Sequence, residues 1–281
     1  MVKIRFQKGH RMKIPPLIYG TAWKKEQTAD LVETAVTSGF RGIDTACQPK
    51  HYHEAGVGEA LMRLKSLGIE REELFVQTKF TPLAGQDPAR IPYDPKAPLE
   101  LQVEESFSAS LHNLQSEYVD SLVLHSPLFP YPNLLKVWGA MEKIAHSGTA
   151  HRIGISNCYD LELLKRLYSD AEVKPSVVQN RFYADSGYDI ALRQWCDAMG
   201  IVYQSFWSLT ANPHILGSRE FFALTQEYNK TEAQILYRYL NQIGIVPLIG
   251  STSKVHIAED LDIFSFELRS DEIASISALL L

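Results

Sequence analysis

The sequence alternates short runs rich in β-branched residues with stretches of helical periodicity over almost its whole length. This alternation is typical of βα units arranged around a parallel sheet. Eight strands flanked by eight helices form a (β/α)8 TIM barrel, although a count alone does not exclude a doubly wound open sheet. The predicted strands are residues 16–22, 40–46, 74–80, 119–126, 152–157, 176–182, 201–207 and 245–250.

Predicted helices lie between these strands, because apolar residues recur there at three- and four-residue intervals. In the first helix, Thr28 is a candidate N-cap and Gly39 a candidate C-cap. The amphipathic residues 1–14 predict a short β-hairpin that covers the N-terminal end of the barrel. The helix candidates are residues 28–39, 54–64, 99–114, 133–148, 161–169, 190–200 and 231–244.

The length of 281 residues allows two small domains, but one α/β barrel of ~250 residues also fits. Eight βα units and the hairpin use nearly the whole chain, so we expect a single barrel domain over residues 1–281. One segment, residues 81–99, breaks the regular pattern. Its five prolines exclude a regular element and predict a long ordered loop, which is a candidate lid.

Composition excludes several classes of protein. With 45% hydrophobic and 22% charged residues, the chain is close to globular averages and is neither disordered, collagenous nor a coiled coil. A net charge of −5 without a long block of like charges offers no surface for nucleic acid or an anionic membrane. No apolar run is long enough for a signal peptide or a membrane span. The three cysteines lack the spacing of a zinc site. We expect a cytoplasmic protein with free thiols, a monomer or weak dimer that binds a small molecule and no metal.

Polar side chains follow apolar stretches at the ends of several neighbouring predicted strands, where the chemistry of a barrel is expected. An unpaired buried charge is costly, so these groups must meet partners or line a wet cleft. Each also has a simpler interpretation: the Asp could cap a turn, the Lys could reach solvent, and the His could be a hydrogen-bonded core residue. The residues are Asp44, Lys79, His125, Ser156, Asn157, Gln179 and Asn180.

Motifs of other chemistries are missing from the sequence. It has no phosphate-binding loop of P-loop type, no GxSxG nucleophile elbow and no HExxH zinc motif. The pair Gly56 and Gly58 lacks the third glycine of a dinucleotide-binding turn and follows no predicted strand. We therefore interpret this glycine pair as part of a helix.

Seven segments resemble the aldo-keto reductase family in order and spacing, from about Ile14 to Leu261. They are GFRGIDTA, YHEAGVGEAL, ELFVQTKF, VDSLVLHSP, HRIGISN, VVQNRF and IGSTSKVHIAEDL. The resemblance implies a (β/α)8 barrel that binds NADP(H), or sometimes NAD(H), without a Rossmann domain. It also implies reduction of aldehydes and ketones.

The resemblance places the catalytic tetrad on Asp44, Tyr52, Lys79 and His125. Hydride attack on a carbonyl leaves an alkoxide that must be protonated, and the Tyr52 phenol is the expected donor. Lys79 should lower the pKa of that phenol, and Asp44 should keep Lys79 charged. His125 would orient the carbonyl oxygen. Tyr52 lies further along the chain from Asp44 than is usual in the family, so the segment CQPKH before it, residues 47–51, resembles a short insertion with its own backbone path.

The same resemblance implies a cofactor site. Ser156, Asn157 and Gln179 match residues that hold the nicotinamide carboxamide, and Phe206 matches the ring stacked on the nicotinamide. The usual lysine and arginine of the adenosine end are replaced by Gly250 and His256, so the preference for NADP(H), which we favour over NAD(H), should be weak. The predicted cofactor contacts are Asp44, Ser156, Asn157, Gln179, Phe206, Leu209 near the pyrophosphate, Gly250, Ser251, His256, Glu259 and Asp260.

For the substrate, Trp23 matches an aromatic wall of the family's pocket, whereas Thr81 and Ser126 stand where bulky aromatics are frequent. A roomier and more polar pocket for a carbonyl compound is expected. Two other classes of function remain open. One is a regulatory barrel that binds the cofactor with little turnover, and the other is a lyase or aldolase that forms a Schiff base through Lys79. The second alternative leaves Ser156, Asn157 and Gln179 without a role.

Overall fold

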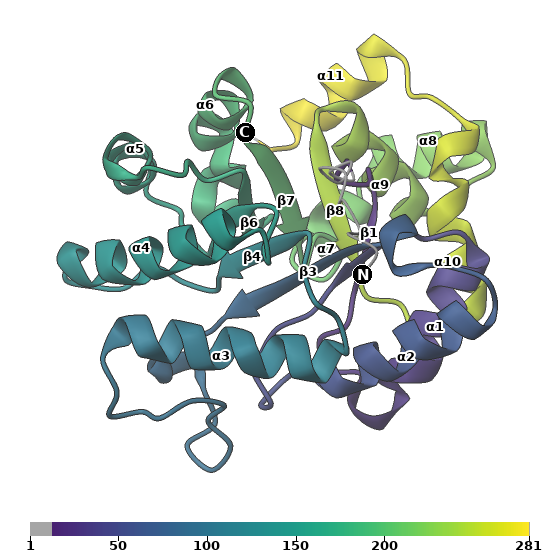
Figure 1. Cartoon of the computed structure of the whole chain (residues 1–281). Helices are drawn as coiled ribbons and strands as arrows, with labels where there is room; N and C mark the ends of the chain where they lie inside the picture. Colours follow the sequence, from purple (N-terminus) through teal and green to yellow (C-terminus); the bar gives the residue numbers. More distant parts are fainter. Residues whose placement is uncertain (1–12, 281) are drawn as a thin grey trace, which may run out of the picture.

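The computed structural model describes residues 13–280 and shows a closed barrel of parallel strands (Figure 1). Neighbours in the chain are neighbours in the barrel, and β8 pairs with β1. All eight predicted strands are confirmed, and closure excludes the open sheet. The strands are β1 Ile18–Gly20, β2 Gly42–Asp44, β3 Phe75–Phe80, β4 Ser121–Leu124, β5 Ile153–Ser156, β6 Val177–Arg181, β7 Val202–Phe206 and β8 Ile245–Ile249.

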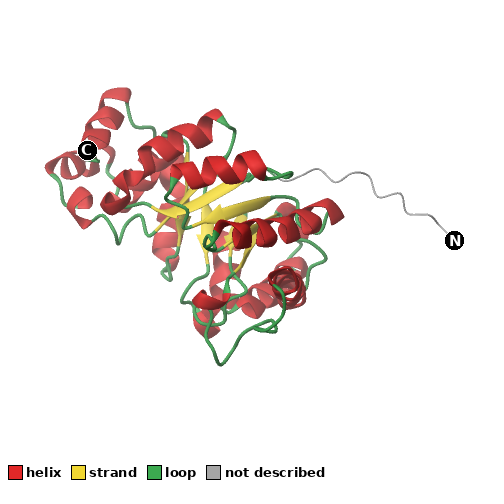
Figure 2. Cartoon of the chain, turned by 90° about the vertical axis from the view of Figure 1, so that its left-hand side faces the viewer, coloured by secondary structure: helices red, strands yellow, loops and turns green. Residues whose placement is uncertain are grey.

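Helices surround the barrel, as the turned view in Figure 2 shows. The seven helix candidates are present, and the other four α-helices of the described residues, at 213–216, 219–228, 254–261 and 270–278, lie outside the candidate ranges. None of the helices in residues 13–280 is long and apolar enough to cross a membrane. The helices are α1 Thr28–Ser38, α2 Glu54–Ser66, α3 Leu99–Leu114, α4 Tyr131–Ser147, α5 Leu161–Asp170, α6 Ile190–Ala198, α7 Pro213–Leu216, α8 Arg219–Tyr228, α9 Glu232–Gln242, α10 Lys254–Leu261 and α11 Ser270–Ala278.

The two predicted caps of α1 have different outcomes. Gly39 is the C-cap, with a φ of 129° that suits glycine, and its N–H binds the Ala35 and Val36 carbonyls. Thr28 is not the N-cap. A short 3-10 turn at Lys25–Gln27 precedes the helix, Gln27 takes the cap position, and the Thr28 hydroxyl donates to the Lys25 carbonyl at 2.7 Å. The expected hairpin at residues 1–14 lies outside the described residues, apart from its last two.

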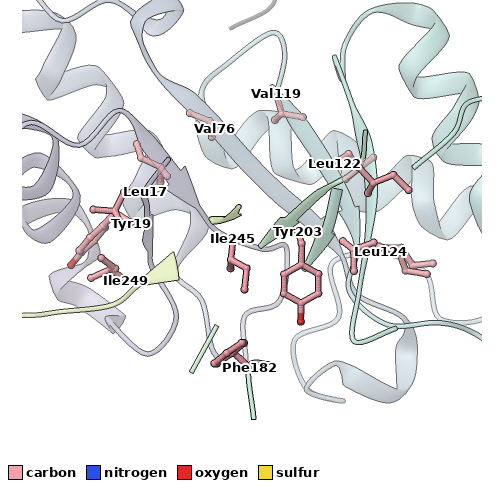
Figure 3. Packing of buried hydrophobic residues seen from close by; sticks show 14 of the residues in the cluster. Leu17, Tyr19, Val76, Val119, Leu122, Leu124, Phe182, Tyr203, Ile245 and Ile249 are labelled. Carbon is pink, nitrogen blue, oxygen red and sulfur yellow. The ribbon is translucent and has the colours of Figure 1, made fainter. Parts of the chain in front are cut away.

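Outward-facing strand residues and the helices form one apolar core, part of which Figure 3 shows. Tyr19 and Ile249 are register partners in β1 and β8 and lie side by side. The three cysteines, Cys47, Cys158 and Cys196, are free and buried, as expected.

Helices α2 and α3 approach each other closely at Gly58. A Cβ atom at this position would lie 2.0 Å from the Asn113 carbonyl oxygen, so only glycine permits the contact. Gly56 also lies within α2. The interpretation of this glycine pair as helix is therefore confirmed.

The proline-rich segment forms an irregular loop from Thr81 to the start of α3, broken by a single 3-10 turn at Leu83–Gly85. It is fastened to the segment between β2 and α2. Gln86 donates to the Cys47 carbonyl at 3.0 Å, and Gln48 donates to the Gly85 carbonyl at 2.7 Å. These two segments therefore pack as one unit beside the mouth of the barrel.

Candidate functional site

A buried ion pair joins the ends of β2 and β3. The Lys79 ammonium lies 2.5 Å from Asp44 Oδ2 and donates to the Thr45 carbonyl at 2.8 Å. Both side chains are almost completely buried. Burial alone would lower the pKa of Lys79, but the Asp44 carboxylate and the Tyr52 phenol raise it above its usual value. Lys79 is therefore an ammonium ion at neutral pH.

Tyr52 reaches this pair from the inserted segment. Its ring centroid lies 5.0 Å from Lys79 Nζ, a distance at which an ammonium ion interacts with an aromatic ring. The segment turns back on itself through the Tyr52 N–H, which donates to the Gln48 carbonyl at 3.0 Å. The net pKa shift of Tyr52 is upward, contrary to the sequence prediction. Burial raises it more than Lys79 lowers it, and Asp44 raises it further.

His125 follows β4 and completes the group. Its ring lies 6.1 Å from the Tyr52 ring at an angle of 69°. Thr81 Oγ1 is 2.7 Å from His125 Nδ1, and this hydrogen bond fixes the orientation of the imidazole. Burial, and then Lys79 and His51, lower the pKa of His125 to about 3, so the ring is neutral at pH 7. All four predicted tetrad residues are thus brought together.

Three glutamines lie around Asp44 inside the barrel. Gln77 and Gln179 donate to Asp44 Oδ1 at 2.8 and 3.0 Å, and Gln204 accepts from both of them at 2.8 and 2.9 Å. Of these three glutamines, only Gln179 was predicted from the sequence to contact the cofactor. Gln77 and Gln204 nevertheless follow the period of two that marks inward-facing strand residues. Gln77 stands two residues before Lys79, and Gln204 stands two residues before Phe206.

The predicted nicotinamide residues gather at the carboxyl ends of β5, β6 and β7. Ser156 donates to the Gln179 carbonyl at 2.6 Å. Asn157 has a φ of 54° and donates to the His125 carbonyl at 2.8 Å. Phe206 ends β7 with a half-buried ring, and Leu209 follows it. Asn180 does not reach the site, because its amide holds Cys158 and Asp189 on the outer side.

The residues predicted for the adenosine end lie before α10 and along its length. Ser251 accepts from the Tyr19 hydroxyl at 2.7 Å through its carbonyl, and Gly250 is exposed before it. His256 is exposed and Glu259 half-buried. Asp260 is buried, and burial, together with Glu259, raises its pKa to about 7.

A cation that the sequence analysis missed lies beside Gly250. Lys24 Nζ donates to the Gly250 carbonyl. A Cβ atom built on residue 250 would lie 3.5 Å from Lys24 Nζ. Lys24 is 8% exposed, and burial lowers its pKa. No carboxylate within residues 13–280 forms an ion pair with it. Two adjacent lysines after Trp23 were the only signal in the sequence.

The residues predicted to contact substrate lie in different environments. Trp23 is 58% exposed, and its ring centroid lies 3.9 Å from that of His51. Ser126 is half-buried beside His125. Thr81 is buried and touches the site through His125. Trp207 was not predicted. It is 51% exposed, with the Arg181 guanidinium 4.2 Å from the centre of its ring.

Comparisons with known proteins agree with this geometry. A model of the Aldo/keto reductase family matches residues 16–202. Glyoxal reductase of Bacillus subtilis is 30% identical over 253 residues, which cover 90% of this chain and 83% of the relative.

Solved structures show the same architecture. An aldo-keto reductase from a Medee basin deep-sea metagenome library superposes with a TM-score of 0.80 at 26% identity, covering 95% of this chain and 92% of that one. The Bombyx mori aldo-keto reductase AKR2E4, solved in complex with NADP, superposes with a TM-score of 0.78 at 26% identity. The superposition covers 94% of this chain and 89% of that one. The chain belongs to the aldo/keto reductase family of oxidoreductases.

Proposed function

We propose that the protein reduces an aldehyde or ketone to an alcohol with NADP(H), and that Tyr52 supplies the proton. The observation that carries the proposal is the position of Lys79 Nζ, which lies 2.5 Å from Asp44 Oδ2 and 5.0 Å from the centre of the Tyr52 ring. A neutral His125 ring stands beside the same phenol. An acid, an electrostatic partner and an uncharged hydrogen-bonding group thus surround one point at the barrel mouth.

The residues present fit a nicotinamide cofactor. Gln179 Oε1 has no hydrogen-bond partner among the described residues, so an amide acceptor is free where the resemblance places the carboxamide. The half-buried Phe206 ring offers an apolar face. At the opposite end, Lys24 supplies a cation without a carboxylate partner, beside residues 251–253 at the start of α10. Lys24 thus places a cation beside position 250, where the family's usual lysine is absent.

When bound, the cofactor supplies the hydride that adds to the carbonyl carbon. The residues of the chain handle the proton. As negative charge develops on the carbonyl oxygen, the Tyr52 hydroxyl donates its proton to that oxygen, and the phenolate left behind is stabilised by the Lys79 ammonium. Asp44 holds this ammonium in place. In the absence of ligand the phenol is fully protonated, because burial raises its pKa.

His125 orients the substrate in this proposal. A ring with a pKa of about 3 stays neutral and acts through a hydrogen bond to the carbonyl oxygen rather than through a charge. Thr81 holds the ring in one orientation. We propose a polar aldehyde or ketone as substrate, since Thr81 and Ser126 stand where bulky aromatics are frequent in the family and a relative is named glyoxal reductase.

The raised pKa of Lys79 argues against the lyase alternative. A Schiff base requires a neutral amine as nucleophile. Lys79 is instead held as an ammonium by Asp44 and by the Thr45 carbonyl. Borohydride trapping of a substrate on Lys79 would overturn this assignment.

The decisive experiment is a titration with NADPH followed by addition of a generic aromatic aldehyde, while the absorbance of reduced nicotinamide is recorded. We expect binding and turnover. Binding without turnover would favour the regulatory barrel. Tyr52→Phe should abolish reduction and leave the Kd for NADPH nearly unchanged, whereas a variant with most of its activity would assign the proton to another group. Equal Kd values for NADPH and NADH would contradict the preference for NADP(H).

A further inference from the structure

Three fully buried amides close the floor of the candidate site, and we call Gln77, Gln179 and Gln204 the glutamine cluster. They come from β3, β6 and β7, and their side chains are 0%, 3% and 0% exposed. Gln179 and Gln204 are register partners on neighbouring strands. Gln77 reaches Gln204 from across the barrel. Fully buried amides are uncommon in a barrel interior, where branched apolar residues dominate.

The Asp44 carboxylate determines which way each amide points. A carboxylate only accepts hydrogen bonds, so the nitrogens of Gln77 and Gln179 must face Asp44 Oδ1. The same two nitrogens also donate to Gln204 Oε1. Gln204 Nε2 then donates to Gln77 Oε1 at 3.2 Å, which closes the network. Only one arrangement of the three amides satisfies all these contacts.

This arrangement leaves Gln179 with one side-chain hydrogen-bonding group that has no partner in the cluster, its Oε1 acceptor. Both of its N–H groups are used, one by Asp44 and one by Gln204. Its Oε1 has no partner among residues 13–280, so Gln179 can only accept a further hydrogen bond. A rotated amide would bring Oε1 against Asp44 Oδ1 and Gln204 Oε1, where three acceptors would meet without a proton.

We propose that Gln77 and Gln204 are positioning residues that fix the Gln179 amide as an acceptor for the N–H of the cofactor's carboxamide. The proposal rests on the proposed function, because it deepens the binding of a nicotinamide cofactor. The cluster also connects that contact to the reaction centre. Asp44 accepts a hydrogen bond from Gln179 on Oδ1 and pairs with Lys79 through Oδ2. One carboxylate therefore supports both the cofactor contact and the ammonium beside Tyr52.

The test compares two ligands that differ in the nicotinamide. NADPH carries the carboxamide, and adenosine 2′,5′-bisphosphate carries only the adenosine end. Wild-type protein is titrated with both first, and failure to bind NADPH there would overturn the proposed function rather than this inference. In Gln204→Met, the Gln179 amide loses one acceptor and gains freedom to rotate. The Kd for NADPH should rise about tenfold, with no change for the bisphosphate beyond about twofold.

A double-mutant cycle separates positioning from general loosening of the barrel. If Gln204 acts through Gln179, then Gln204→Met should add nothing to the loss of NADPH affinity already present in Gln179→Ala. Equal weakening of both ligands, additive losses in the double variant, or no loss at all would each overturn the inference.

A second variant covers the case in which Gln204→Met does not fold. Gln77→Leu leaves Gln204 Nε2 without its acceptor and loosens the cluster from the opposite side of the barrel. It should also weaken NADPH selectively over the bisphosphate, by about threefold or more. Unchanged selectivity in this variant would likewise contradict the proposal.

Discussion

Removal of the Lys79 charge should expose the cost of a buried carboxylate. In Lys79→Met, Asp44 Oδ2 loses its donor at 2.5 Å and the Thr45 carbonyl loses its donor at 2.8 Å. Breaking a buried pair by removing one partner costs about 3–5 kcal/mol. Two amides still donate to Asp44 Oδ1, so we expect a value near the lower end, about 3 kcal/mol. In a chain of 281 residues that corresponds to a fall in Tm of roughly 5 °C.

Urea unfolding followed by circular dichroism measures this loss of unfolding free energy. Asp44→Asn combined with Lys79→Met should recover at least half of the loss. The exposed pair of Lys165 and Glu162, 2.8 Å apart, provides the control, and Lys165→Met should change stability by less than about 1 kcal/mol. A double variant as unstable as Lys79→Met would refute the electrostatic explanation.

Three further predictions concern packing, thiols and cofactor binding. Gly58→Ala should destabilise the protein by about 1–3 kcal/mol in urea unfolding, because its Cβ would overlap the Asn113 backbone. Gly139→Ala in α4, where nothing lies within 4 Å of the new Cβ, should instead stabilise it by about 0.5–1 kcal/mol, and the same sign for both variants would contradict the packing argument. The three cysteine thiols are buried and their pKa values are raised to about 12, so a disulfide reagent should label none in the native protein and all three in denaturant. Asp260, with its pKa raised to about 7, gains its negative charge as the pH rises through 7. The Kd for NADPH should therefore increase between pH 6 and 8 in titrations, because the cofactor is also negatively charged. Asp260→Asn should abolish this pH dependence, and a variant that keeps it would point to another group.

Local patterns were sufficient to predict the strands and the polar residues at their ends. Inward-facing residues repeat every second position, so Asp44, Lys79 and Gln179 could be assigned to the barrel mouth before their contacts were known. Gln77 and Gln204 follow the same period, but their contact with each other arises only when the barrel closes, because β3 and β7 are far apart in the strand order.

Other contacts depend on closure of the barrel and have no local signal. Lys24 and Gly250 are far apart in the chain and meet only because β8 pairs with β1. The prediction that Thr28 is the N-cap of α1 was wrong for a different reason. A 3-10 turn before α1 moved the helix start by one position, which is the kind of shift that terminal turns commonly produce.

The fastening of the proline-rich loop to the inserted segment limits how the site can be redesigned. Because Gln86 binds the Cys47 carbonyl and Gln48 binds the Gly85 carbonyl, a graft of residues 81–98 from a relative without the inserted segment would arrive without its anchors. Tyr52 lies in the segment that would lose those contacts. Exchange of substrate specificity between such relatives therefore requires that both segments be transplanted together.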